Sequence, residues 1–348
     1  MKTEHTKGSS RRGFLKHAAA GVTAAALGPQ VIVRAQENQG ERGGMLGSGE
    51  YTYEWIDNWA KLPETKKFGN THAVCEVADG RIFVHNQSED SVAIFDPDGN
   101  FMSSWGPEYA GGAHGMQLSK EGNEEFLYLA TTGLRTVVKT TLTGEKVFEL
   151  RYPKESGVYE TEEKYSPTNI AIAPNGDFYV ADGYGQSYIH HYNAKGEYIR
   201  SWGGKGSEPG QMSCPHGIWI DTRGAEPEIV VADRSNIRLQ YFSLDGKHLR
   251  FVNDGFLHPC HFDQRGTDLL VPDLHGRVTL IDKDNKVIVQ LGENPGVNKV
   301  QGYPNLPHEQ RMPGKFISPH GACFDKAGNI FVAEWIPDGR VTKLRKVS

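Results

Sequence analysis

The sequence has few cysteines and few apolar residues. Four cysteines occur in 348 residues, and no two form the Cys-X-X-Cys pair of a zinc ribbon or a thioredoxin-like site. Only 37% of the residues are apolar, which disfavours a protein of long buried helices. Glycine does not recur at every third position, so collagen is excluded, and 10% aromatic residues argue against wholesale disorder.

The cysteines fall in segments that we expect to be strands. Small buried thiols are the interpretation we favour there, with disulfides as the open alternative if the chain reaches an oxidising compartment. The four positions are Cys75, Cys214, Cys260 and Cys323.

Basic residues are scarce outside the N-terminal region. Residues 1–35 carry six basic side chains and one acidic one, which leaves 32 basic and 42 acidic side chains, a net charge of −10, for the rest. Nucleic acids and anionic membranes require a basic surface, so neither is expected as the main partner.

The N-terminal region itself predicts export. Ser-Arg-Arg-Gly-Phe-Leu-Lys at 10–16 precedes an Ala-rich stretch at 18–27 and the small-residue cleavage site at 33–35. This order is typical of a twin-arginine signal, and the apolar stretch is too short for the roughly 20 residues of a membrane span. We therefore expect a periplasmic or extracellular protein with no transmembrane anchor, which meets the twin-arginine translocon during export.

Glycine is abundant and marks an internal repeat. It accounts for 41 residues, about 12% against a usual ~7%. Segments 167–182 and 319–334 align without a gap, each as strand, glycine turn and strand. The residue eight places before each turn glycine defines six equivalent positions, which we call the ring positions: His72, His114, Thr168, His216, His258 and His320.

These positions predict an all-β, six-bladed propeller. They are 42, 54, 48, 42 and 62 residues apart, near the 40–50 residues of a blade with loops added. Only 28 residues follow His320, enough for three strands. The alternating segment 51–56 is expected to supply the fourth and to close the ring. The predicted organisation is a signal at 1–35, a linker at 36–50 and the propeller at 51–348.

Five of the six ring positions are histidine. A single histidine before glycine is most simply bonded to a neighbouring backbone, but buried imidazoles gathered on one axis leave nitrogens unsatisfied unless they share a metal. Alternate blades lie about 120° apart, so His114, His216 and His320 are predicted to form a three-nitrogen zinc site with one open side. His72 and His258 remain as outer-shell donors, extra ligands or substrate contacts.

The repeats resemble NHL repeats, with 233–242 close to that repeat's second half. Most of residues 70–345 resemble the peptidyl-α-hydroxyglycine α-amidating lyases, six-bladed propellers with zinc on three histidines in the central cavity. The resemblance implies that these ligands are His114 in His-Gly-Met, His216 in Pro-His-Gly-Ile and His320 in Pro-His-Gly-Ala. It also implies C–N cleavage that yields an amide and glyoxylate.

The resemblance assigns further roles. Tyr184 matches the catalytic tyrosine and Arg234 an active-site arginine, and Thr168 in Pro-Thr-Asn fits the family's third blade. A second active-site arginine of the family falls on Gln87, with His85 nearby, so these two are candidate substrate contacts.

Other features of the family pattern differ. The acid that accompanies a structural calcium in the family is Gly321 here, so calcium lacks that ligand, and Gly185 stands where a cysteine follows the tyrosine. From the residues alone, Tyr184 fits a capping aromatic as well as a catalyst, and Arg234 fits a structural ion pair with Asp233 or with an acid of a neighbouring blade. Acids that end the second strands are expected to belong to the repeat: Asp182, Asp233, Asp273 and Glu334.

We therefore predict a metalloenzyme in which zinc, or another divalent ion, assists C–N or C–O cleavage of a small or peptide-like substrate. The alternative is a non-catalytic NHL propeller that binds a protein, peptide or glycan, because the fold alone does not decide function. Calcium-dependent lactone hydrolysis ranks last, since calcium prefers oxygen ligands and the predicted axis is rich in imidazole.

Overall fold

The computed structural model describes residues 44–347, so the expected export signal at 1–35 lies outside the described residues. Within that range the chain forms strands and short 3₁₀ helices, and no helix there is long and apolar enough to cross a membrane. The short helices are η1 Gly49–Tyr51, η2 Pro107–Tyr109, η3 Lys154–Ser156, η4 Glu162–Lys164, η5 Arg234–Asn236, η6 Val297–Lys299 and η7 His308–Gln310.

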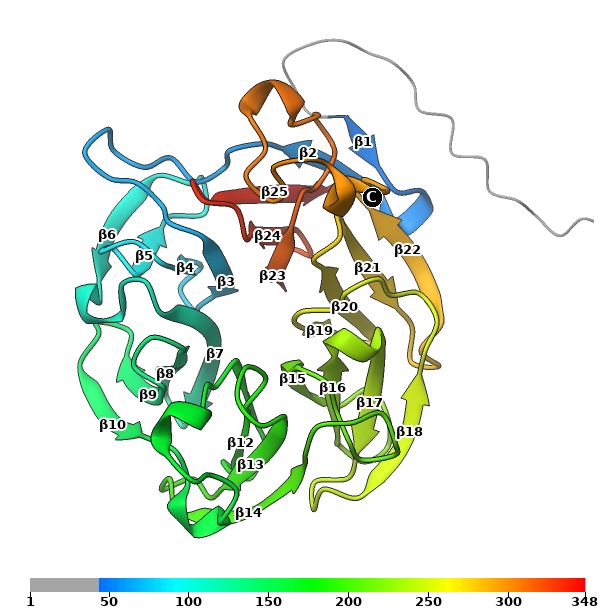
Figure 1. Ribbon diagram of the computed structural model, residues 1–348. Helices are drawn as coiled ribbons and strands as arrows, with labels where there is room; N and C mark the ends of the chain where they lie inside the picture. Colours follow the sequence, from blue (N-terminus) through cyan, green and yellow to red (C-terminus); the bar gives the residue numbers. More distant parts are fainter. Residues whose placement is uncertain (1–43, 348) are drawn as a thin grey trace, which may run out of the picture. The chain divides into compact units, whose positions relative to one another are not determined.

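Six antiparallel sheets surround a central channel, which confirms the predicted propeller (Figure 1). Blades 1 to 5 each contain four consecutive strands, the first nearest the channel. The blade strands are β3 Thr71–Glu76, β4 Ile82–Asn86, β5 Val92–Phe95 and β6 Phe101–Trp105; β7 Ala113–Glu121, β8 Glu124–Thr131, β9 Thr136–Thr141 and β10 Lys146–Leu150; β11 Asn169–Ile172, β12 Phe178–Ala181, β13 Tyr188–Tyr192 and β14 Tyr198–Gly203; β15 Pro215–Asp221, β16 Glu228–Asp233, β17 Arg238–Phe242 and β18 His248–Val252; β19 Asp263–Arg265, β20 Asp268–Asp273, β21 Arg277–Ile281 and β22 Val287–Leu291; β23 Pro319–Phe324, β24 Ile330–Glu334 and β25 Arg340–Lys346.

The sixth blade joins the two ends of the described chain, as the repeat arithmetic predicts. Strand β2 (Tyr53–Ile56) pairs antiparallel with β25, and Trp55 lies opposite Leu344. Strand β1 (Met45–Leu46) adds a fifth strand from within the range expected to be a linker. Closure leaves no blade without a neighbour, which removes the open edges that would otherwise invite aggregation.

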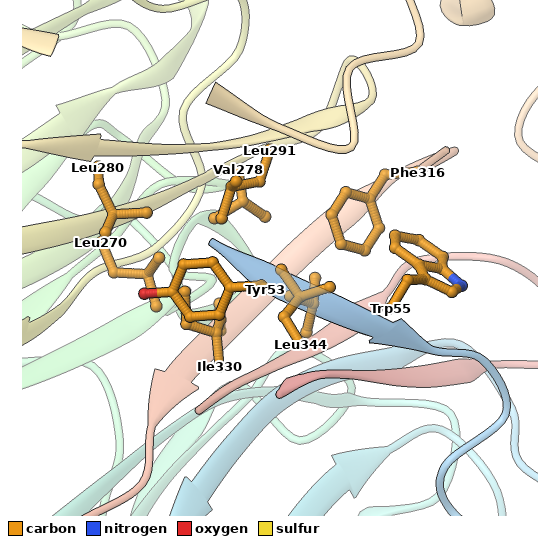
Figure 2. Packing of buried hydrophobic residues seen from close by; sticks show 11 residues of the cluster. Tyr53, Trp55, Leu270, Val278, Leu280, Leu291, Phe316, Ile330 and Leu344 are labelled. Carbon is orange, nitrogen blue, oxygen red and sulfur yellow. The ribbon is translucent and has the colours of Figure 1, made fainter. Parts of the chain in front are cut away.

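Strand β2 is held by its buried face. Tyr53 and Trp55 are each 1% exposed, whereas Glu54 and Ile56 between and beyond them are partly exposed. Figure 2 shows the two aromatic side chains against Phe316 and aliphatic residues of β20 to β22, β24 and β25. The ring centroids of Trp55 and Phe316 are 4.6 Å apart. The closing strand therefore packs against blade 5 as well as pairing within blade 6.

The glycines of two hairpin turns show positive φ angles, as expected for the turns that their spacing predicts. Gly176, between β11 and β12, has φ +88°, and Gly328, between β23 and β24, has φ +87°. A side chain at such φ values is strained, so glycine is the residue these hairpins favour.

The acids at the ends of second strands stabilise the loops of their own blades. In blades 3 to 6 a carboxylate oxygen accepts a hydrogen bond of 2.5–2.7 Å from a backbone N–H of the loop that leads to the inner strand. Asn86 does the same in blade 1, where Oδ1 accepts from Gly69 N at 3.2 Å. These contacts support the prediction that the acids belong to the repeat.

The cysteine expectation is partly wrong. Cys75 lies in β3 and Cys323 in β23, but Cys214 and Cys260 lie in the loops that lead to inner strands. Cys214 has φ +58°, a turn conformation that the apolar pattern around it did not reveal. All four thiols are free in the structure.

The channel also contains a cavity of about 220 Å³, lined in part by Asp263, His261, Cys75 and Cys323. The partly exposed Asp263 faces this cavity, and burial raises the pKa of its carboxyl to about 7, against the hydrogen bond it accepts from Phe324 N at 2.6 Å. A carboxyl with a raised pKa binds its proton more tightly in the folded chain than in the unfolded chain.

Trp55→Ala should lower the free energy of unfolding by about 3–5 kcal/mol, because it empties a core position at the ring closure. Chemical denaturation measures this value. Ile199→Ala is the matched control, since Ile199 is 40% exposed on β14 and its truncation should cost less than about 0.5 kcal/mol. Equal effects of the two substitutions would contradict the closure described above.

Asp263→Asn should change how stability depends on pH. Because the folded pKa is raised, the Asp263 contribution to stability falls as pH rises from about 4 to about 7, by an amount on the order of a few kcal/mol. Asparagine cannot ionise but keeps an oxygen for Phe324 N. Denaturation from pH 4 to pH 8 should show the variant gaining stability over the wild type as pH rises; parallel curves would exclude the raised pKa.

Candidate metal centre

Three inner strands bring the three predicted zinc ligands together on the propeller axis. His114 starts from β7, His216 from β15 and His320 from β23, and their three ring-centroid separations are 4.7–4.8 Å. They are 1–4% exposed. The three imidazoles that the alternate-blade reasoning selected therefore lie close together.

Each imidazole of the triangle is fixed by the blade that follows it. Nδ1 of His114 donates to Thr168 O at 2.7 Å, Nδ1 of His216 to Cys260 O at 2.8 Å, and Nδ1 of His320 to His72 O at 2.9 Å. A neutral imidazole that donates through Nδ1 has a free lone pair on Nε2. The backbone thus sets the same tautomer in all three rings, which is how proteins orient histidine ligands.

The glycine after each histidine makes this contact possible. A Cβ on Gly115 would lie 2.5 Å from Thr168 O, one on Gly217 2.5 Å from Cys260 O, and one on Gly321 2.4 Å from His72 O. These are the carbonyls that accept from the imidazoles. Glycine therefore lets the neighbouring strand approach closely enough to hold the ring.

Local irregularities aim the histidines at the axis. The pairing register shifts at His114 in β7, at His216 in β15 and at His320 in β23, and β3 shifts in the same way at His72. Bulges of this kind turn a side chain out of the regular alternation of a strand. The register of β11, after Thr168, has no such shift.

Burial keeps these imidazoles neutral. It lowers the pKa of His114 to about 3 and lowers the pKa of His216 and His320 well below the ordinary value. Neutral imidazoles are the form that binds a metal, so the three rings need no deprotonation step at neutral pH.

Tyr184 lies where the prediction put it, beside the histidines. Its hydroxyl oxygen is 3.2 Å from Nε2 of His114 and 3.1 Å from Nε2 of His216, so the proton can be donated to either ring. The tyrosine as a whole is 45% exposed, but the hydroxyl points inward, and burial raises its pKa to about 12 while Arg234 opposes this shift. A capping role alone does not explain this contact.

Arg234 contacts Tyr184 rather than the neighbouring acid. Nη1 and Nη2 are each 3.4 Å from the tyrosine oxygen, and Nη2 is 3.3 Å from Cys214 Sγ. Asp233 pairs instead with Arg238 at 2.7 Å. Among residues 44–347 Arg234 forms no ion pair with a carboxylate, and its Nε is buried without a partner. The alternative of a structural ion pair with Asp233 is wrong.

The other ring positions differ in their surroundings. Thr168 Oγ1 donates to backbone oxygens of Ala181 and Pro215, and its own carbonyl holds His114. His258 turns toward His275, with the rings stacked at 4.6 Å. His72, by contrast, packs on His320 and His114 at 4.3 and 4.8 Å between centroids.

Within the described chain, the two candidate substrate contacts in blade 1 are not hydrogen-bonded to Tyr184 or Arg234. His85 is fully buried in β4 with both ring nitrogens unpartnered, and burial lowers its pKa to about 4. Gln87 is half-buried, and its Nε2 lies 3.5 Å from Ala113 O, next to His114 in the chain. Neither side chain has a hydrogen bond to Tyr184 or Arg234 within the described residues.

Sequence reasoning missed two neighbours of the site. Cys214 contacts Arg234, a role that its position two residues before His216 suggests in retrospect. His261 is 6% exposed beside the channel cavity, with neither ring nitrogen hydrogen-bonded.

The residues present fit a metal. Nε2 of His320 is buried without a hydrogen-bond partner, and candidate ligand atoms of His72, His114 and His320 all lie within 4.8 Å of one another. His72 thus belongs to this cluster of nitrogens. The Nδ1 anchor, by contrast, is shared by His114, His216 and His320 and is absent from His72. Imidazole nitrogens suit zinc, copper, iron or nickel better than calcium.

The chain is similar in sequence to amidating enzymes and to NHL-repeat proteins. No family model matches the chain. A peptidyl-glycine α-amidating monooxygenase B of Xenopus laevis is 30% identical over 186 residues, 49% of this chain and 20% of that protein. A peptidyl-α-hydroxyglycine α-amidating lyase 1 of Drosophila melanogaster is 26% identical over 72% of this chain and 48% of its own length. Human NHL repeat-containing protein 3 is 25% identical over 62% and 65% of the two chains.

Solved structures share the fold. A streptogramin B lyase superposes with a TM-score of 0.56 at 14% identity, covering 86% of this chain and 99% of that one. A gluconolactonase of Xanthomonas campestris gives 0.59 at 12% identity, over 85% and 91%. The match spans a fifth of the Xenopus relative and about half of the Drosophila one. The chain is thus a six-bladed β-propeller similar in sequence to peptidyl-α-hydroxyglycine α-amidating lyases and NHL-repeat proteins.

Proposed function

We propose that the protein is a metal-dependent lyase that cleaves a C–N or C–O bond of a small or peptide-like substrate. The observation that carries the proposal is the convergence of three imidazoles that are each anchored through Nδ1, with the Tyr184 hydroxyl within hydrogen-bond distance of Nε2 in two of them. His114, His216 and His320 would hold zinc or another divalent ion, which supplies Lewis-acid activation of a substrate oxygen.

The substrate class that the relatives' names suggest is a peptide ending in α-hydroxyglycine. In such a compound the hydroxyl proton leaves and its electron pair forms a carbonyl. The C–N bond breaks at the same carbon, and the nitrogen takes a proton. The products are an amide and glyoxylate, so atoms and charge balance without an oxidant.

The chain's own residues suit that chemistry. The Tyr184 hydroxyl lies 3.2 Å and 3.1 Å from the two Nε2 atoms that would hold the ion. It is placed to give its own proton to the departing nitrogen and to take the proton of the substrate hydroxyl in exchange. Arg234 has donors that no carboxylate of the described chain satisfies, so it can bind the carboxylate of the substrate. Gln87 offers an uncharged amide where the lyase family has a second arginine. Substrate binding is therefore predicted to depend less on the charge of the substrate than in that family.

We infer export from the sequence alone. The twin-arginine pattern at 10–16 and the cleavage site at 33–35 support a periplasmic or extracellular location. That route carries folded proteins, which is compatible with metal insertion before export.

Purified protein should contain about one zinc, or another divalent transition metal, per chain. The His114→Ala/His216→Ala double variant should lose it, because two of the three proposed ligands are gone. Elemental analysis measures the content, and zinc should raise the melting temperature of the wild type but not that of the double variant, since binding stabilises the folded state. His308→Ala is the control, because that imidazole is 80% exposed and its removal should leave the metal content unchanged. Metal-free wild type that refuses zinc would contradict the proposal and favour the non-catalytic propeller.

Tyr184→Phe should lower kcat about 10²–10⁴-fold on an N-acyl-α-hydroxyglycine, with glyoxylate release as the measurement, because it removes the proton-transfer group. Arg234→Gln should mainly raise KM by removing a charge-assisted contact. Tyr188→Phe, four residues along the chain, is the control and should keep wild-type rates. Activity retained in Tyr184→Phe would rule out the assigned role, and no activity in the zinc-loaded wild type would rule out this substrate class.

A further inference from the structure

His72 is a buried imidazole with no partner of its own. It is 3% exposed, and neither Nδ1 nor Nε2 has a hydrogen bond. A neutral imidazole has one N–H and one lone pair, and neither is satisfied here. Leaving buried polar atoms unpaired is costly, so the position favours a ligand that satisfies them.

The propeller fold does not by itself leave a ring position buried and without a hydrogen bond. The equivalent positions in blades 3 and 5 differ from His72 in this respect. Thr168 satisfies its hydroxyl on two backbone carbonyls. His258 is only partly buried and stacks on His275. Of these three residues, only His72 packs against the central imidazoles. Its ring centroid lies 4.3 Å from that of His320 and 4.8 Å from that of His114.

The backbone of β3 aims His72 as the other blades aim their ligands. Its pairing with β4 shifts register between Thr71 and Ala73, at the histidine itself. The same irregularity occurs at His114, His216 and His320. The four ring-position histidines that share the bulge are the four whose imidazoles meet at the axis.

We propose that His72 is a fourth imidazole ligand of the metal, an inference that rests on the proposed metal site at His114, His216 and His320. The candidate ligand atoms of His72, His114 and His320 already lie within 4.8 Å of one another, so small side-chain rotations bring them to a common ion.

The fourth ligand leaves room for the substrate. Tyr184 bonds the pair His114 and His216, whereas His72 packs on the pair His114 and His320. The two groups therefore meet different edges of the imidazole triangle, so His72 does not take the edge that Tyr184 contacts. An all-imidazole set of four also favours a transition metal over calcium or magnesium.

Cobalt(II) replacing the native metal reports on the number of ligands through its visible absorption. We compare the wild type with His72→Phe, which keeps a flat ring but removes both nitrogens, and with His258→Phe at an equivalent ring position. His72→Phe should weaken metal binding about tenfold or more in competition with a chelator and change the cobalt spectrum. His258→Phe should do neither. An unchanged spectrum and affinity in His72→Phe would overturn the proposal.

A measurement without a variant covers the case in which His72→Phe does not fold. X-ray absorption of the zinc-loaded wild type counts the imidazoles around the ion: four rings support the proposal and three overturn it. Failure of the wild type to bind any metal is a different result, because it also removes the three-histidine site of the proposed function.

Discussion

The close approach of neighbouring inner strands at three His-Gly steps is the constraint on which the centre depends. Each step places a glycine where a Cβ would meet the next blade's carbonyl, and the same carbonyl accepts from the imidazole before it. One backbone oxygen thus sets both the spacing of two blades and the tautomer of a ring. Any side chain at Gly115, Gly217 or Gly321 would push apart the strands that hold the histidines.

Ring closure makes these approaches possible. His320 is held by the carbonyl of His72, so one anchor joins blade 6 to blade 1 across the two ends of the propeller. Strand β2 contributes Tyr53 and Trp55 to the core between blades 5 and 6, and this packing keeps β23 in place. The geometry at the axis therefore depends on a hydrophobic cluster far from it, and the acids that cap the loops fix where each inner strand begins.

Much of this arrangement was predictable from the residues. The glycine spacing predicted six blades and the closing strand, and alternate blades predicted the triangle of His114, His216 and His320. The sequence could not distinguish His72 from His258, because both occupy the same register and differ only in a bulge and in a neighbour, His275. Nor did it reveal that Cys214 adopts a turn conformation, because no glycine or other turn-favouring residue stands at that position. The contact of Arg234 with Tyr184 was also hidden, since it joins loops of blades 3 and 4.

The proposed function depends on a metal held on the propeller axis by the anchored imidazoles. Anomalous diffraction from crystals of the zinc-loaded protein, recorded on both sides of the zinc absorption edge, tests it most directly. The account predicts one strong peak on the axis, about 2.0–2.1 Å from Nε2 of His114, His216 and His320, with their Nδ1 contacts unchanged. A map with no axial peak, or with zinc bound only at exposed histidines such as His308, would contradict it.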